Sequence, residues 1–245
     1  MSVYIDSRDG SPALYFDNKK VVPILYALSD IPASRSNTLQ AQRNIQNFAE
    51  QGINVVVVDT ALSLGWHKAT PFEIEPAQAE ISGVLEANPN AKIIVRLHLN
   101  PPYWWMRDNP DELIEYNGIA GIDDGESYRL IRGDAQKNMR VSLASEKWLK
   151  EAGELLRLFC EKLSSTEEGK CVIGIQVACG IYGEWHQWGT DTGSAMKKRF
   201  RRYLKEKYIN DTSLQKAWGC DNVTIESAHF VPDPHQPGDY GIFRD

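Results

Sequence analysis

INVVVVD at residues 53–59 and AKIIVRLHL at residues 91–99 are two short runs rich in valine, isoleucine and leucine. A third run, VIGIQVA at residues 172–178, has the same character. Continuous apolar runs that lack a polar alternation are typical of parallel strands covered on both faces. The small residues Gly174 and Gly180, in and after the third run, further indicate close approach of the backbone to another group.

Segments with helical periodicity separate these runs. Apolar residues recur at helical spacing over residues 39–51, 75–88, 146–163 and 193–208, and residues 21–28 predict a first strand. Successive strand–helix units predict one domain with a parallel sheet and right-handed crossovers.

The residues that follow the predicted strands distinguish a TIM barrel from an open, doubly wound sheet. The segment SDIPASRS at residues 29–36 lacks the glycine-rich phosphate turn of a dinucleotide-binding sheet. Polar and aromatic residues instead follow the carboxyl end of every strand, where TIM barrels place their catalytic groups. We therefore predict an α/β fold of the (β/α)8 TIM-barrel type, with about the first four βα units present in residues 1–245.

Composition and charge limit the possible partners. The chain has 245 residues, 42% hydrophobic and 24% charged, with a net charge of −6. Because nucleic-acid-binding domains usually carry a basic excess, we expect no nucleic-acid partner. The basic run KKRFRRYLKEK at residues 197–207 is compatible with such a surface, but its apolar residues at helical spacing favour the solvated outer face of a helix. No stretch approaches the roughly 20 apolar residues that a membrane span needs.

The amino terminus leaves the compartment open. MSVYIDSRDG lacks the charged and apolar regions of a signal peptide. The chain as it stands is expected in the cytoplasm, and a protein from which a signal peptide was removed is expected in the periplasm or outside the cell.

Cysteine and histidine spacing predicts no metal site and no cofactor. The cysteines show no CxxC spacing, and the loop histidines have no neighbour at ligand spacing. We expect the cysteines to be mostly buried as small apolar side chains. The residues concerned are Cys160, Cys171, Cys179, Cys220, His67, His229 and His235.

The segment GIYGEWHQWG at residues 180–189 places one carboxylic acid among aromatic side chains. Aromatic surroundings that exclude water favour the protonated form of a carboxylic acid. A protonated acid can donate a proton to a leaving group, so Glu184 is the candidate catalytic residue. Its neighbours in a binding site are predicted to be Tyr182, Trp185, His186, Gln187 and Trp188.

The third predicted strand carries polar side chains in alternation. Arg96, His98 and Asn100 point to the same side of it, where a charge needs a partner or a ligand. Two interpretations stay open for Arg96: a substrate-binding residue, or a structural residue paired with a carboxylate on a neighbouring strand. Asp59, at the end of the second strand, is a further candidate at the same rim.

An aromatic cluster follows the third strand, at the start of a loop of more than 40 residues. Pro101 and Pro102 stiffen the exit from the strand, and Trp104 and Trp105 come directly afterwards. Flat tryptophan faces can stack on sugar rings, but tryptophans also fill space under loops. As a cluster, they favour a binding cleft.

Several of these segments together resemble a known family. RNIQNFAEQGINVVVVD at residues 43–59, the proline–tryptophan run, GIYGEWHQWG, and RRYLKEKYINDTSLQKAWG at residues 201–219 are similar to the N-terminal half of clan A glycoside hydrolase barrels. The nearest resemblance is to glycoside hydrolase family 42 β-galactosidases. It implies an oligosaccharide or β-galactoside substrate and retaining hydrolysis, with Glu184 as the general acid/base.

The chain departs from that family pattern in two ways. Gly183 stands where clan members place an asparagine that binds the sugar 2-hydroxyl, and Gln187 or His186 is a possible substitute. Retaining hydrolysis also needs a second carboxylate about 5–5.5 Å from the first. We expect that nucleophile outside these residues, on the remainder of a longer catalytic domain. The open edges of a half barrel are expected to favour pairing with a second copy.

Two alternatives remain on the sequence alone. A carbohydrate-binding or scaffolding module would keep the aromatic cleft without the chemistry. An inverting half-barrel enzyme would need a carboxylate about 6.5–9.5 Å from Glu184, and Asp59 is the candidate for it.

Overall fold

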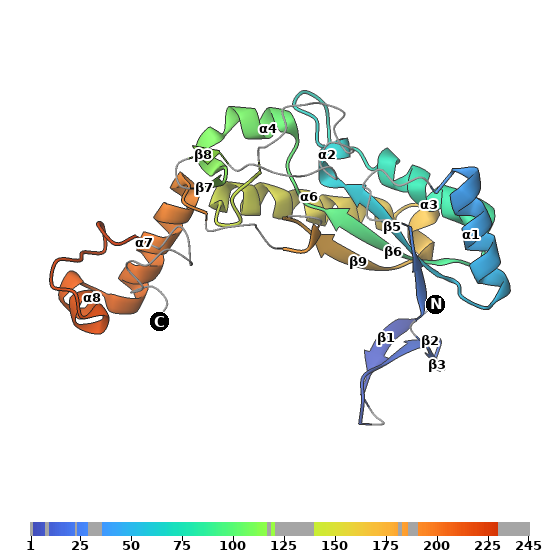
Figure 1. Ribbon diagram of the computed structural model, residues 1–245. Helices are drawn as coiled ribbons and strands as arrows, with labels where there is room; N and C mark the ends of the chain where they lie inside the picture. Colours follow the sequence, from blue (N-terminus) through green and yellow to red (C-terminus); the bar gives the residue numbers. More distant parts are fainter. Residues whose placement is uncertain are drawn as a thin grey trace. The chain divides into compact units, whose positions relative to one another are not determined.

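The apolar runs that the sequence marks as strands form a four-stranded parallel sheet (Figure 1). Its strands pair in the order β4-β5-β6-β9, which is also their order in the chain. They are β4 (Leu25–Ala27), β5 (Val55–Ala61), β6 (Lys92–His98) and β9 (Val172–Ala178). The parallel pairing confirms the predicted α/β sheet.

The computed structural model describes residues 2–7, 10–22, 24–28, 36–116, 119–120, 140–180, 183–185 and 191–229. The chain divides into two compact units. We call residues 1–65, 72–98 and 157–178 the sheet unit, and residues 66–71, 99–156 and 179–245 the helical unit.

Two predicted helices belong to the sheet unit. Helix α1 (Leu39–Glu50) begins after Thr38, whose hydroxyl accepts a hydrogen bond from the Ala41 amide, as a good N-cap does. Helix α3 (Glu75–Ala87) contacts both α1 and β5. Its apolar residues Ile81 and Val84 are fully buried. The short helices α2 (Leu62–Gly65) and η2 (Glu168–Cys171) also belong to this unit.

The first strand is shorter than predicted, and an unpredicted antiparallel sheet precedes it. That sheet consists of β1 (Val3–Asp6), β2 (Ala13–Phe16) and β3 (Lys19–Val21). The predicted strand over residues 21–28 is therefore divided between β3 and β4, and the sequence places Pro23 between them. Asp17 and Asn18 link β2 to β3 with positive φ angles, as a two-residue type I′ hairpin requires.

Strand β9 is only half-buried, whereas the sequence predicts burial on both faces. Its apolar residues from Val172 to Val177 have intermediate exposure, and Gln176 is exposed. Within the described chain β9 pairs with β6 alone, so one of its edges has no neighbour. Strand β4 is the opposite edge of the sheet.

The predicted long loop before residue 146 contains ordered elements in its described parts. They are α4 (Tyr103–Asp108), η1 (Pro110–Glu112), β7 (Glu115–Tyr116) and β8 (Ile119–Ala120). A β-bridge between Leu113 and Val141 joins the two ends of this region. The loop prediction was wrong here because these elements are too short for a periodic pattern to reveal them.

Helices α6 (Glu146–Ser164) and α7 (Ser194–Tyr208) agree with the predicted helices. Helix α8 (Asp211–Trp218) was not predicted from periodicity, and it packs against α7 around a small core. The members of this core include Leu204, Tyr208, Leu214 and Val223.

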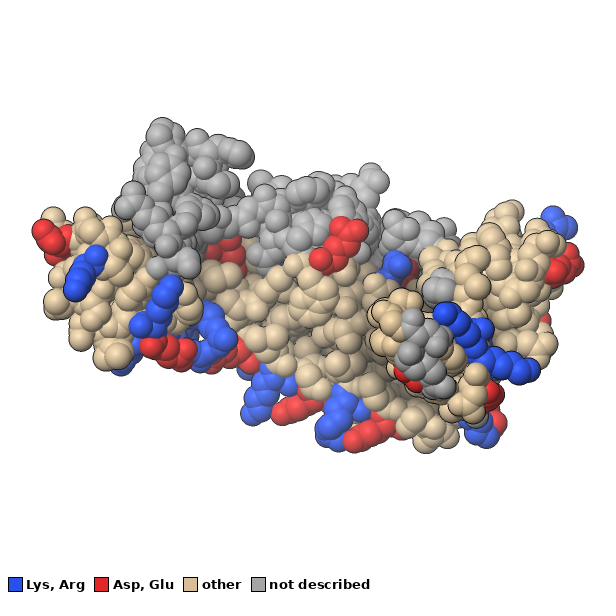
Figure 2. Space-filling model, turned by 90° about the horizontal axis from the view of Figure 1, so that it is seen from below, with Lys and Arg blue, Asp and Glu red and all other residues tan. Residues whose placement is uncertain are grey.

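The basic residues of α7 lie among acidic ones. Arg199 and Arg202 both pair with Glu146, and Arg201 pairs with Glu226 at 3.0 Å. Figure 2 likewise shows lysine and arginine side chains next to acidic ones on the face in view, not gathered by sign. Mixed charge of this kind is typical of the solvated outer face of a helix. None of the described helices is long and apolar enough to cross a bilayer.

The connection between α7 and α8 is strained at Ile209. This residue has φ 70° and ψ −45°, and the Asn210 amide donates to the Tyr208 carbonyl at 2.7 Å, which defines a γ-turn of the strained hand. A β-branched residue in this region is an outlier. The Ile209 side chain is 77% exposed, so burial does not offset the strain.

We expect Ile209→Gly to raise the free energy of unfolding by about 1 kcal/mol, because relief of strain exceeds the added chain entropy of glycine. Urea unfolding measures the change. Ile209→Val, which keeps the β-branch, should leave stability almost unaltered. A lower stability for the glycine variant would contradict the strain argument.

Candidate functional site

A row of polar side chains crosses three adjacent strands of the sheet unit. Asp59 of β5, Arg96 of β6 and Gln176 of β9 are register partners, so their side chains point to the same face. Arg96 Nε lies 3.4 Å from Asp59 Oδ1 and 3.3 Å from Gln176 Oε1. Arg96 is therefore paired with a carboxylate on the neighbouring strand, which is one of the two interpretations that the sequence left open.

His98 extends this cluster by one step along β6. Its Nε2 lies 3.6 Å from Asp59 Oδ1, too far for a hydrogen bond. Both atoms are buried and have no hydrogen-bond partner, and both side chains are at most 4% exposed. Two buried polar atoms thus lie close together without a hydrogen bond between them.

The bonding of Asp59 is weak for a buried carboxylate. Its closest hydrogen bond is a 3.5 Å contact from Arg96 Nη1 to Oδ2. A buried charge with few hydrogen bonds lowers the stability of the fold by several kcal/mol. Such a group needs an explanation, and a functional role is a common one. This polar row is accordingly the part of the sheet unit most suited to holding a polar ligand.

Removing Arg96 should destabilise the fold, because the buried Asp59 carboxylate loses its ion-pair partner. We expect Arg96→Met to lower the free energy of unfolding by about 3 kcal/mol, since it leaves a buried carboxylate without its cation. Adding Asp59→Asn to that variant should restore more than half of the loss, as measured by urea unfolding. Arg157→Met, which removes an exposed ion pair with Glu161, is the control and should change stability by less than about 0.5 kcal/mol. No recovery in the double variant would refute the pairing.

In the helical unit, Asn100 is buried and bonded to protein. Its Oδ1 accepts from the Cys179 thiol at 3.1 Å. Burial raises the pKa of Cys179 to about 12, so this cysteine is an inert thiol. This bond occupies the Asn100 carbonyl oxygen, and the contact of Asn100 with substrate stays a prediction. Cys160 and Cys220 are exposed, contrary to the prediction of mostly buried cysteines.

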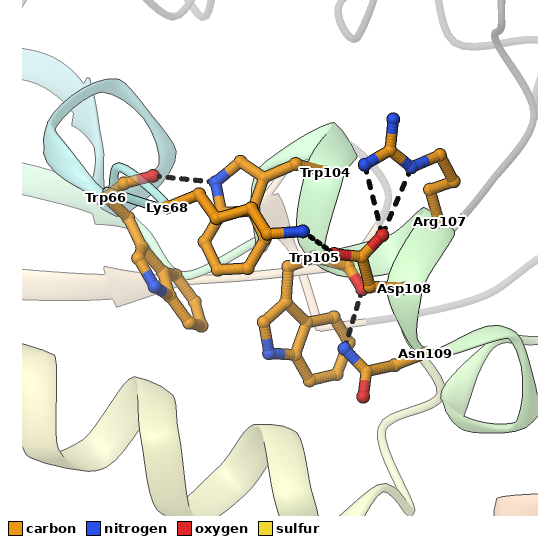
Figure 3. Close-up of polar contacts among 7 residues, drawn as sticks. All are labelled: Trp66, Lys68, Trp104, Trp105, Arg107, Asp108 and Asn109. Atoms are coloured by element: carbon orange, nitrogen blue, oxygen red, sulfur yellow. Dashed lines mark hydrogen bonds and ion pairs between the residues drawn. The ribbon is translucent and has the colours of Figure 1, made fainter. Parts of the chain in front are cut away.

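The two tryptophans after β6, which Figure 3 shows as sticks, differ in their burial. Trp105 is 1% exposed, and its indole N–H donates to Glu151 at 2.5 Å. It therefore fills space under the loop, which is one of the two interpretations that the sequence left open for these tryptophans. Trp104 is half-buried, and its indole N–H donates to the Trp66 carbonyl at 3.1 Å, which fixes the ring at right angles to Trp66.

Lys68 and Asp108 lie beside the Trp104 ring, as Figure 3 shows. The Lys68 ammonium is 5.9 Å from the ring centroid and pairs with Asp108, which also accepts two 3.1 Å hydrogen bonds from Arg107. Hydrogen bonds from Lys68 and then Arg107 hold the pKa of Asp108 below its ordinary value of 3.8.

This lowered pKa predicts a pH dependence. Because the folded pKa lies below the unfolded one, the Asp108 contribution is present above pH 3.8 and is lost as the pH falls through the folded pKa. The difference in Tm between the wild type and Asp108→Asn should therefore shrink with acidification. Lys68→Met removes the larger cause of the lowered pKa. In that variant, Asp108→Asn should therefore change Tm by less than it does in the wild type. A pH-independent difference would contradict the assignment.

The segment around Glu184 makes a tight turn after β9. Gly183 and Trp185 both have positive φ angles, 79° and 59°, and the Trp185 amide donates to the Cys179 carbonyl at 2.9 Å. Glu184 is exposed and Trp185 is 44% exposed, and Trp185 is the only member of the predicted aromatic enclosure that lies within the described residues. The predicted neighbours Tyr182, His186, Gln187 and Trp188 lie outside the described residues.

The structure thus brings together Asp59, Arg96 and His98 in the sheet unit. Sequence reasoning missed Gln176, although its place in the register with Arg96 follows from strand pairing. It also missed Lys68, for which no local pattern was available. The described residues contain no cluster of three or more His, Cys, Asp or Glu side chains that could hold a metal ion.

Comparison with protein-family models and with curated proteins finds no match. Among solved structures, a β-galactosidase from the psychrophilic Marinomonas ef1 is similar with a TM-score of 0.59 and 17% identity, over 88% of this chain and 30% of that protein. A cold-adapted β-galactosidase from Rahnella sp. R3 is similar with a TM-score of 0.51 and 19% identity, over 81% of this chain and 27% of that protein. The chain therefore spans less than a third of the length of either structure, and at this identity the likeness establishes a shared fold.

Proposed function

We propose that this chain is the N-terminal part of a (β/α)8 catalytic domain that hydrolyses β-galactosides or related oligosaccharides with retention of configuration. Support for the barrel comes from the sequential parallel order β4-β5-β6-β9 and from the fold shared with two β-galactosidases. Residues 1–245 would supply about the first four βα units of that domain.

The observation that carries the proposal is the strained turn that presents Glu184. A tryptophan with φ 59° is unfavourable by roughly 1–3 kcal/mol, and strain of this kind concentrates at functional sites. The turn begins five residues after β9 ends, at the carboxyl end of a parallel strand. Catalytic residues of TIM barrels come from such strand ends.

In the proposed mechanism Glu184 protonates the glycosidic oxygen as the aglycone leaves. A carboxylate outside these residues attacks the anomeric carbon and forms a glycosyl–enzyme intermediate, and Glu184 then removes a proton from the attacking water. The reaction requires no cofactor. Arg96 and His98 would bind sugar hydroxyls from the polar row, and Asp59, the ion-pair partner of Arg96, would hold its guanidinium in place.

Trp185 is the exposed aromatic residue nearest to Glu184 in the described sequence. We assign it, with Trp104, to stacking against the sugar. Tyr182, His186, Gln187 and Trp188 remain proposed contacts on the sequence alone, and Gln187 or His186 would take the place of the absent asparagine at the 2-hydroxyl.

The test is Glu184→Gln in the complete natural protein. We expect kcat/KM for an alkyl β-galactoside to fall by about 10²–10⁴-fold, because that leaving group needs a proton. A 2,4-dinitrophenyl β-galactoside, whose leaving group needs none, should lose far less. With Glu184→Ala, added azide should restore turnover of the dinitrophenyl substrate and yield a β-galactosyl azide.

Glu154→Gln, on an exposed position of α6, serves as the control and should retain full activity. Equal losses for both leaving groups, or full activity of Glu184→Gln, would show that Glu184 is not the acid/base. If the complete protein hydrolyses no glycoside and still binds sugars, the carbohydrate-binding module is the correct function.

A further inference from the structure

A polar cavity of about 430 Å³ lies within the helical unit, where η1 meets the first turns of α6 and α7. Its volume is in the range of small-molecule sites, about 300–1,000 Å³. None of its lining residues is among those assigned above to hydrolysis.

The charges that line the cavity are balanced. Among the residues that the structure describes, they comprise three carboxylates and three cations, and several of them already have partners. Glu146 pairs with Arg199 at 3.2 Å, and Lys147 pairs with Glu151 at 3.2 Å. Glu112 accepts from the Ser145 hydroxyl at 2.6 Å. These contacts fix the wall of the cavity.

Three polar side chains of the wall have no partner in the described part of the protein. The side chains of Asp111, Ser194 and Lys198 form no hydrogen bond or ion pair within the described chain. They offer an acceptor, a hydroxyl that both donates and accepts, and a donor. Helix α7 also begins without a side-chain cap, so its first-turn amides, including that of Ala195 in the wall, add donors.

The lining limits the chemistry of the ligand. Balanced charge offers no net attraction to an ion of either sign. The described part of the wall has no aromatic residue, and its only apolar side chains are those of Ala144 and Ala195, which provides little for an apolar ligand. Mixed donors and acceptors instead match hydroxyl groups, since each hydroxyl donates one hydrogen bond and accepts others.

We propose that this cavity binds a neutral polyhydroxylated ligand of about monosaccharide size. Asp111 accepts from one hydroxyl of the ligand, and Lys198 donates to another. Ser194 and the first-turn amides of α7 bind a third.

Titration of ¹⁵N-labelled protein with D-galactose, D-glucose or sorbitol tests the site directly. The amide signals of Ala144, Ser194 and Ala195 should shift and saturate. Lys198→Met and Asp111→Asn should each weaken binding about tenfold, as expected for loss of one charge-assisted hydrogen bond. Lys198 is exposed and unpaired within the described chain, so its loss should not affect folding.

Lys197→Met is the matched control, because Lys197 is the adjacent exposed lysine on α7 and does not line the cavity. It should bind the same ligands unchanged, and Glu184→Gln should as well, which separates this site from the proposed hydrolysis. The proposal is overturned if none of the three polyols shifts these amides saturably, if Lys198→Met binds as the wild type does, or if inorganic phosphate or glycine shifts them more strongly.

Discussion

Burial of strand β5 at every position sets the conditions for the rest of the sheet unit. All seven residues from Val55 to Ala61 are buried, and one of them is Asp59. A carboxylate in such a strand needs a cation on an adjacent strand. The parallel register supplies Arg96 from β6, and Gln176 from β9 holds the other side of the guanidinium. The polar row is thus a consequence of strand pairing.

A second constraint acts where the chain leaves the strands. The indole N–H groups of Trp104, Trp105 and Trp148 all donate to protein acceptors, including the Leu99 carbonyl at 3.0 Å from Trp148. Buried tryptophans require such partners, and in meeting that requirement they fix the loop after β6. Trp105 and Trp148 are therefore structural, and the half-buried Trp104 keeps its proposed role in binding. Strain is found elsewhere, at the turn that carries Glu184.

Much of the fold could be predicted because it rests on long periodic segments. Helices α3 and α6 each extend over several turns and carry a clear apolar stripe. Their predicted bounds agree closely with the observed ones. The N-terminal antiparallel sheet and the elements between residues 103 and 120 were missed, since two to six residues are too few to show a period. The half-burial of β9 was missed for another reason. Apolar composition does not reveal how many neighbours a strand will have.

The sequence by itself determined which residue types were available for chemistry and which segments would form the parallel sheet. It also placed Arg96 and His98 on one side of their strand, because alternation is a local property of extended backbone. Only the tertiary structure decided that Arg96 meets Asp59, that Trp105 is buried and Trp104 is not, and that Glu184 is exposed. Those outcomes depend on contacts between segments distant in the chain, and their energies are set by burial and pairing, which no local pattern encodes.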